Sequence, residues 1–196
     1  MTGLTIESHG GEESRAFIPA IARLRLEVFR DWPYLYDGDP EDEERHLGRY
    51  AACPDSVVAL AFDGRAVVGA STALPLVHES DAVSGPFRAL GIDPSPILYL
   101  GESVLLPGYR GQGIGVAFFE RREAWARRLG LTRCAFCGVV RDPGDARQPP
   151  GWAPLDDFWR KRGYAPVPGL SAQFSWTEIG ADHKTAKPMR FWIKDL

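Results

Sequence analysis

The stretch SVLLPGYRGQGIGVAFFERREAWARRLG, from Ser103 to Gly130, carries glycines at positions 108, 111, 113 and 115 and then becomes a long amphipathic run. A strand that ends at Leu106, turns through PGYRG and enters a helix at about Gly113 would direct free backbone N–H groups and the positive end of a helix dipole at one spot. Glycine permits positive φ there and lets phosphate oxygens approach the main chain. The pattern predicts a phosphate-binding loop; the alternative is a tight turn with a close contact between helix and sheet.

Two common phosphate-binding motifs do not match this loop. A P-loop needs lysine directly after the second glycine of G-x-x-x-x-G, but Ile114 follows Gly113. The dinucleotide motif G-x-G-x-x-G needs glycine where Val116 or Phe118 stands. What remains is the pattern R-x-x-G-x-G, which begins at Arg110.

The composition is that of a soluble globular protein of one domain. The chain has 196 residues, of which 44% are hydrophobic and 25% charged, with a formal net charge of -3. This charge argues against nucleic acid as a general partner. The start MTGLTIESHGGEESR lacks the basic and apolar regions of a signal peptide, and no apolar run is long enough to span a bilayer. We therefore expect a cytoplasmic protein without a membrane partner.

The cysteines and histidines do not predict a metal site. CAFC has zinc-like spacing, but Cys134 and Cys137 would point to opposite faces of a strand, and there is no second pair. Three cysteines are also too few for a disulfide framework. The four histidines form no ligand spacing, so packing, surface or loop positions are expected for them.

The hydrophobic patterns predict the element order β-α-α-β-β-β-α-β-α-β-β. Strands are expected over 4–8, 56–63, 66–74, 96–106, 132–140, 172–179 and 190–196. Helices are expected from 15 onward, over 39–50, from about 113 to 129, and over 155–163. The segment 77–92 is compatible with a helix or with a long loop.

Together with the preceding VLLPGY, the loop pattern resembles the cofactor-binding motif Q/R-x-x-G-x-G/A of the GNAT superfamily of acyl-CoA-dependent N-acyltransferases. The element order matches that superfamily's fold through nearly the whole chain, and LDDFWRKRGY resembles its second signature. The resemblance implies an α/β fold of the α+β type: one domain over residues 1–196, with a mixed, mostly antiparallel, splayed central sheet flanked by helices.

The resemblance also implies acetyl-CoA as co-substrate, with the acetyl group moving to a primary amine by direct attack in a ternary complex. In such proteins the coenzyme A pyrophosphate lies on the amides of the glycine loop, and the pantetheine arm lies along the preceding strand. By position, the loop contacts fall on Arg110, Gly111, Gln112, Gly113, Ile114 and Gly115. The pantetheine contacts fall on the backbone of Ser103, Val104 and Leu105.

Glu102 is the candidate catalytic base. It lies in the apolar segment ILYLGESVLL, just before the expected pantetheine contacts, and period two places it on the face of Leu100 and Val104. A carboxylate among apolar residues should have a raised pKa, which suits removal of a proton near neutral pH. An equally weighted alternative is a buried acid paired with a structural arginine.

The general acid is where the sequence departs from the resemblance. Many members carry tyrosine four residues before the glycine of the second signature, and here Trp159 precedes Gly163. Indole cannot serve as a general acid. The thiolate then leaves unaided, water protonates it, or a hydroxyl such as that of Tyr164 or Tyr36 reaches the site, although a core position is the favoured interpretation for Tyr164.

The acceptor side is expected in the segment WPYLYDGDPEDEE, residues 32–44, where aromatic and acidic residues together would suit a cationic amine. Tyr34, Tyr36 and Asp37 are the favoured substrate contacts. The acids at 39–44 are interpreted instead as the solvated start of a helix.

Two further classes stay open beside the enzyme. A catalytically silent acyl-CoA-binding or sensing module is modestly favoured by the missing tyrosine, whereas a nucleotide-binding regulator is disfavoured by the absent lysine and acidic ribose partner. The acceptor is expected to be a small-molecule or peptide amine. The sequence leaves the acyl chain length and the oligomeric state open, a homodimer included.

Overall fold

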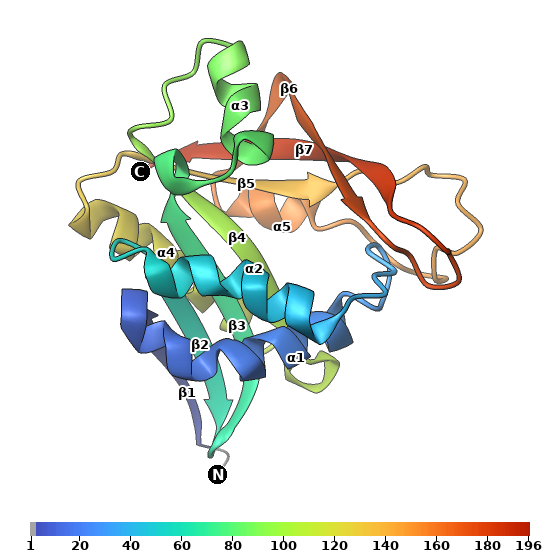
Figure 1. Cartoon of the computed structure of the whole chain (residues 1–196), viewed down its shortest axis with the longest axis horizontal. Helices are drawn as coiled ribbons and strands as arrows, with labels where there is room; N and C mark the ends of the chain where they lie inside the picture. Colours follow the sequence, from blue (N-terminus) through green and yellow to red (C-terminus); the bar gives the residue numbers. More distant parts are fainter. Residues whose placement is uncertain (1–2) are drawn as a thin grey trace.

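The computed structural model describes residues 3–196. Its centre is a seven-stranded sheet in the order β1-β2-β3-β4-β5-β7-β6 (Figure 1). All neighbouring strands are antiparallel except the parallel pair β4 and β5. The strands are β1 Leu4–Gly10, β2 Val57–Asp63, β3 Ala66–Pro75, β4 Ile97–Leu105, β5 Arg133–Val139, β6 Ala165–Trp176 and β7 Thr185–Asp195. The predicted mixed, mostly antiparallel sheet is confirmed.

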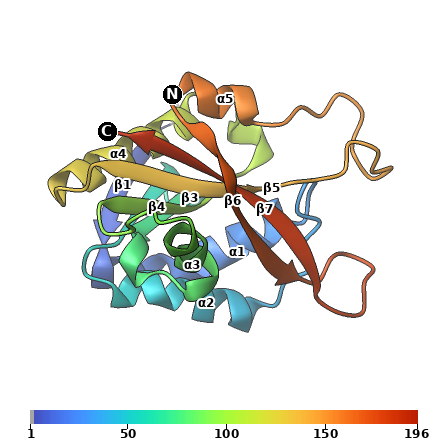
Figure 2. The same cartoon turned by 90° about the horizontal axis from the view of Figure 1, so that it is seen from above.

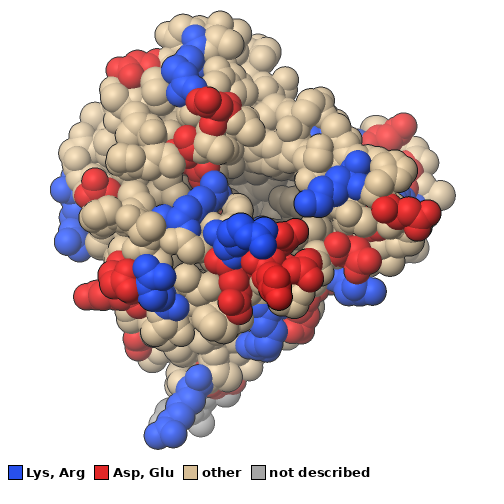
Figure 3. Space-filling model, in the orientation of Figure 1, with Lys and Arg blue, Asp and Glu red and all other residues tan. Residues whose placement is uncertain are grey.

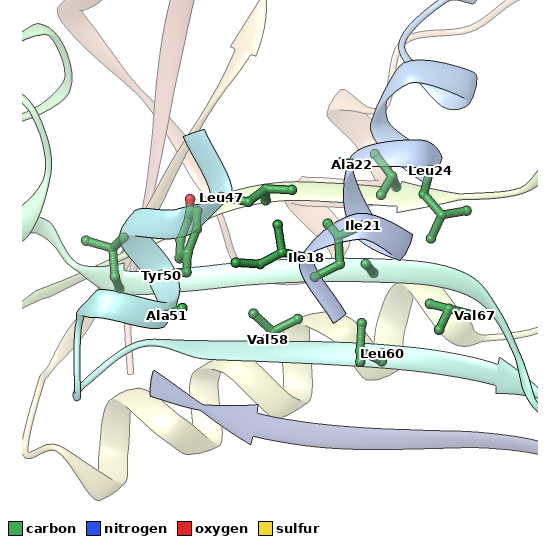
Figure 4. Packing of buried hydrophobic residues seen from close by; sticks show 13 residues of the cluster. Ile18, Ile21, Ala22, Leu24, Leu47, Tyr50, Ala51, Val58, Leu60 and Val67 are labelled. Atoms are coloured by element: carbon green, nitrogen blue, oxygen red, sulfur yellow. The ribbon is translucent and has the colours of Figure 1, made fainter. Parts of the chain in front are cut away.

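Helices cover both faces of the sheet (Figure 2). They are α1 Ile18–Val28, α2 Pro40–Ala52, α3 Asp81–Ala89, α4 Ile114–Arg128 and α5 Asp156–Lys161, with short 3-10 turns η1 Gly11–Phe17, η2 Leu76–His78 and η3 Pro107–Tyr109. Helices α1, α2 and α3 lie on one face, and α4 and α5 on the other. Figure 4 shows α1 and α2 packing Ile21, Leu47 and Tyr50 against Val58 and Leu60 of β2.

The residues at the start of α2 explain where that helix begins. The Asp39 side chain accepts hydrogen bonds from the backbone N–H groups of Glu41 and Asp42, and Pro40 occupies the first helical position. Three acidic residues in the first turn complement the helix dipole. The predicted cap and helix start are confirmed.

Two segments differ from or refine the sequence predictions. The segment 77–92, which the sequence left as a helix or a long loop, contains α3. Its buried Val83 and Phe87 face β4 and β7, but glycine and proline at 85 and 86 are poor helix formers and weaken the helical pattern. Strand β6 begins at Ala165 rather than at 172. Its pairing with β7 is irregular between Pro166 and Ser171, so the first part of the strand lacks a regular sequence pattern. The proline-rich composition of this stretch is typical of a loop.

Strand β4 carries a β-bulge next to Glu102. Ser103 pairs with Ser71 and Leu100 pairs with Ala73, so Gly101 and Glu102 together stand opposite Thr72. Leu100 therefore packs on the α4 side of the sheet, while Val104 packs on the side of α1 and α2. The expectation that Glu102 shares a face with both is wrong, because the bulge interrupts the period of two.

Candidate active site

Strands β4 and β5 diverge soon after they meet (Figure 1). They pair only through Ile97–Tyr99 of β4 and Arg133–Ala135 of β5, although β4 continues to Leu105 and β5 to Val139. The edge of β4 that faces β5 therefore presents unpaired N–H and C=O groups beyond the bulge. The backbones of Ser103, Val104 and Leu105 lie on this edge, where an extended amide-containing arm can be hydrogen-bonded.

The glycine loop joins β4 to α4. Gly111 and Gly113 have φ values of 76° and 83°, which favour glycine. Gly113 is the N-cap of α4, and no side chain caps that end of the helix. Within residues 3–196, no group accepts a hydrogen bond from the amides of residues 111–116, while Ala117 N–H bonds to the Gly113 carbonyl. The loop therefore offers consecutive free donors at the positive end of a helix dipole.

The space outside the loop fits a bulky anion. A Cβ built on Gly111 or Gly113 meets no protein atom within 4 Å, and one built on Gly115 meets only the Phe158 ring, at 3.6 Å. The Arg110 and Gln112 side chains are exposed and bond back to the carbonyls of Leu105 and Gly108. The Ile114 side chain is buried, so this residue offers only its backbone. The residues predicted for coenzyme A are thus brought together in one place.

Glu102 is buried in an ion pair. Its Oε2 lies 2.7 Å from Arg25 Nη1, and the side chain is only 5% exposed. Arg25 also pairs with Glu43, whose other oxygen accepts a 2.7 Å hydrogen bond from the Tyr36 hydroxyl. The alternative interpretation of Glu102, a buried acid paired with an arginine, describes the observed contact. The cluster of Arg25, Glu43 and Glu102 joins α1, α2 and β4.

The expected raised pKa of Glu102 is wrong. Burial alone would raise the pKa of this carboxyl, but the charge of Arg25, with smaller contributions from the neighbouring His46 and Arg49, outweighs burial and holds the pKa well below its usual value of 4.5. Glu102 therefore keeps its negative charge near neutral pH. Its Oε1 is buried and has no hydrogen-bond partner within the described residues.

A cleft of about 650 Å³ opens beside this carboxylate. Figure 3 shows the molecule hollowed at its centre on this face, with basic and acidic side chains gathered around the rim. Aromatic side chains of strands β4 and β6 and of the loop after α1 form much of its wall, and cationic side chains stand at its rim. The lining includes Glu102, Arg25, His46, Arg49, Phe29, Tyr34, Tyr36, Tyr99, Phe174, Trp176, Arg45 and Lys184.

The predicted acceptor residues fall into two groups. Tyr34 and Tyr36 line the cleft. Asp37 does not: its side chain is exposed and contacts Arg30 at 3.2 Å, because the chain turns outward before Asp39 caps α2. The cleft is also lined by residues that were not predicted from the sequence, because they belong to no local motif: His46 and Arg49 of α2, and Phe174 and Trp176 of β6.

The hydroxyl of Tyr164 lies on the opposite side of the sheet from the cleft. It donates a 3.0 Å hydrogen bond to Glu123 of α4, and burial raises its pKa far above the usual range. Trp159 packs against Phe136 and Trp192, also on the α4 side. Both residues serve the core, as the favoured interpretation of Tyr164 predicted.

The two cysteines of CAFC lie on opposite faces of β5. Cys134 packs in the core beneath α4, whereas Cys137 lines the cleft, where its Sγ lies 3.2 Å from the Tyr99 hydroxyl. In the part of the chain that the structure describes, no group of three or more His, Cys, Asp or Glu side chains is arranged to hold a metal ion. Nor does any described helix have the length and apolar character needed to cross a membrane.

A protein-family model, Acetyltransferase (GNAT) family, matches residues 21–148. The chain belongs to the GNAT acetyltransferase family, which confirms the resemblance carried by the glycine loop. A search of curated proteins found no match.

Solved structures share the fold at low sequence identity. An acetyltransferase from Thermus thermophilus is 16% identical, with 100% of each chain covered and a TM-score of 0.61. A ribosomal-protein-alanine N-acetyltransferase from Brucella melitensis is 15% identical, with 98% of this chain and 99% of that chain covered and a TM-score of 0.61. A protein from Salmonella typhimurium, solved with its cofactor acetyl-CoA, is 14% identical, with 98% and 94% covered and a TM-score of 0.56.

Proposed function

We propose that the protein is an N-acetyltransferase that moves the acetyl group of acetyl-CoA to a primary amine by direct attack in a ternary complex. One observation carries the proposal: the unpaired edge of β4 runs from the free amides of the glycine loop to the cleft that contains Glu102. A thioester arm laid along Ser103–Leu105 would therefore end beside that carboxylate.

The donor side is assigned to main-chain groups. The amides of Gly111, Gly113 and Gly115, with Gln112 and Ile114 between them, would bind the pyrophosphate of coenzyme A, and Arg110 would add a positive charge. The backbones of Ser103, Val104 and Leu105 would hold the pantetheine amides. Acetyl-CoA supplies the activated acyl carbonyl, and the chain supplies the orientation of that carbonyl toward the cleft.

The acceptor side is assigned to the cleft. Glu102 lines the cleft, and its buried Oε1, which lacks a hydrogen-bond partner within the described residues, would accept a hydrogen bond from the ammonium or amine of the acceptor. The ion pair with Arg25 keeps this carboxylate charged. The rings of Tyr34 and Tyr36 would contact the rest of the acceptor. Glu102 is thus the proposed catalytic residue: its carboxylate would contact the attacking nitrogen and stabilise positive charge on it.

Release of free thiol from acetyl-CoA across a panel of primary amines tests the activity. We expect turnover with at least one amine. In Glu102→Gln, acetyl-CoA affinity should stay near that of the parent, while kcat falls by about 10² to 10⁴, the range for loss of a group on which proton transfer depends.

The same assay distinguishes the alternatives. Thermal stabilisation by acetyl-CoA without thiol release from any amine would identify a silent acyl-CoA-binding module. A Glu102→Gln variant that is stable and keeps more than about half of the parent activity would remove Glu102 from the mechanism, since that loss is far below the range expected for a group on which proton transfer depends.

A further inference from the structure

His46 stands between the buried carboxylate and solvent. This residue of α2 lines the cleft, and its Nε2 lies 3.7 Å from Glu102 Oε2. Its side chain is 35% exposed, against 5% for that of Glu102. A ring in this position is in contact with both the interior charge and water.

A second neighbour approaches the same nitrogen. Arg49 Nη2 lies 3.3 Å from His46 Nε2. A guanidinium carries only donors, so it can bond to this nitrogen only while the nitrogen is bare. A carboxylate carries only acceptors when charged, so Glu102 can bond to this nitrogen only after it has gained a proton. Nε2 therefore has one partner for each of its two protonation states.

The charges around Glu102 make this carboxylate a poor place for a proton to stay. The guanidinium of Arg25 holds Glu102 ionised, and the free Oε1 suits a positively charged nitrogen. An acceptor that enters as an ammonium ion must nevertheless lose a proton before its nitrogen can attack a carbonyl. That proton needs an acceptor other than the carboxylate which binds the ammonium.

We propose that His46 is a further catalytic residue, which takes at Nε2 the proton of an ammonium ion held by Glu102 and passes a proton from its ring to water. The inference rests on the proposed function. One N–H bond of the ammonium breaks, its electron pair stays on the acceptor nitrogen, and an N–H bond forms at Nε2. The proton on Nε2 then passes to water, which leaves the ring neutral with a bare Nε2, so that no other reactant is consumed.

The cleft that His46 lines contains groups of both signs. Its lining includes Glu102 and Tyr99 of β4, Arg25 of α1, Asp42, Glu43, Arg45 and Arg49 of α2, and Lys184, which precedes β7. Tyr50 of α2 and Glu79 after η2 are further neighbours of the ring. Glu102 and Arg49 are the charged groups in contact with Nε2.

The first test observes the ring without any substrate. Nitrogen-15 NMR of histidine-labelled free protein, assigned by loss of signals in His46→Gln, distinguishes a bare ring nitrogen from one that carries hydrogen. We expect a bare Nε2, with the ring proton on Nδ1, at the pH at which turnover is measured, because the neighbouring Arg49 guanidinium can only donate to this nitrogen. An Nε2 that carries hydrogen at every pH would overturn the inference, because it could not receive a proton.

The second test measures kcat against pH for His46→Gln, with His78→Gln as matched control, since His78 is exposed and does not line the cleft. At pH 7, kcat of His46→Gln should fall by about 10²-fold, within the range for loss of a proton acceptor, while the control keeps the parent value. The deficit should shrink as pH rises, because the amine then arrives neutral. A deficit that is absent, or equal at every pH, would refute the role of His46. If the parent turns over no amine, the proposed function is refuted instead. The NMR measurement would still decide whether Nε2 can receive a proton.

Discussion

Arg25 is the residue on which the charge of the cleft depends. Its buried guanidinium contacts both Glu43 and Glu102, and Tyr36 bonds to the first of these carboxylates. One cation thus contacts two buried carboxylates, and its charge helps to hold the pKa of Glu102 low. The whole group carries a net negative charge while His46 is neutral, which favours a cationic nitrogen at the free oxygen of Glu102.

Replacing this cation should be costly at neutral pH. Arg25→Gln leaves two buried carboxylates unpaired, and we expect the free energy of unfolding to fall by about 3–5 kcal/mol at pH 7. The loss should diminish below pH 5. The low folded pKa of Glu102 gives the parent stability that is present above its usual value of 4.5 and is lost as pH falls. The variant lacks this contribution.

Urea denaturation at pH 7 and pH 4 measures both quantities. Arg30→Gln is the matched control, because Arg30 is more than half exposed in its contact with Asp37 and should change stability by less than about 1 kcal/mol. A deficit in Arg25→Gln that is the same at both pH values would show that the charges of the two carboxylates are not its cause.

At the scale of elements, the bulge of β4 is held from both faces of the sheet. On one side, a Cβ at Gly101 would lie 2.2 Å from the Tyr50 hydroxyl oxygen and 2.5 Å from Thr72 Oγ1. On the other, buried Arg122 of α4 donates hydrogen bonds to the carbonyls of Thr72 and Glu102 and to Ser103 Oγ. The guanidinium satisfies carbonyls at the break in the strand ladder, so α4 helps to set the position of Glu102.

The glycine loop can be tested at Gly115 with little strain in the protein. Gly113→Val would force a β-branched residue to φ 83°, whereas Gly115 lies inside α4 and its Cβ would meet one ring atom at ordinary contact distance. We expect Gly115→Leu to fold with parental stability but to lose thermal stabilisation by coenzyme A, because the side chain would occupy the pyrophosphate site. Gly48→Leu, in the open middle of α2, should keep that stabilisation. Equal thermal shifts in both variants would mean that the anion binds elsewhere.

What the sequence could predict was local in the chain. The loop, its flanking strand and helix, and the cap at Asp39 follow from neighbouring residues, and family membership followed from the loop. The ion pair of Arg25 with Glu102 joins residues far apart in the chain, and no periodicity of the sequence predicts it. The bulge shifts side chains between faces through the pairing of β3 with β4, which is a property of two strands rather than of one. The bulge made the predicted face of Glu102 wrong, and the guanidinium of Arg25 made the predicted raised pKa wrong.

At the scale of the whole molecule, the cleft that contains Glu102 depends on contacts between distant loops. Arg141, after β5, contacts Glu178 at 2.6 Å and donates hydrogen bonds to the carbonyls of Pro33 and Tyr34. Glu178, after β6, also pairs with Arg147 at 2.7 Å. The segment that carries Tyr34 is thereby fixed to the last hairpin, and the donor loop lies on other elements.

Arg141→Ala should therefore weaken binding of the amine without changing binding of coenzyme A. We expect the Michaelis constant for the amine to rise about tenfold, equivalent to loss of a contact of about 1.4 kcal/mol, because the wall that contains Tyr34 loses its support. Thermal stabilisation by coenzyme A should stay at the parent value. Steady-state kinetics with varied amine, together with thermal shift, measure the two effects. A parallel loss of coenzyme A binding would contradict this division.

The short pairing of β4 with β5 has a consequence for how the sheet holds together. Three residues of each strand form the only seam between a half-sheet of β1 to β4 and a half-sheet of β5 to β7 within the described residues. A donor arm bonded to the open edge of β4 would extend that seam, so that the substrate acts for a time as part of the architecture. In each catalytic cycle, binding of the arm would strengthen the connection between the two half-sheets, and release of coenzyme A would weaken it again.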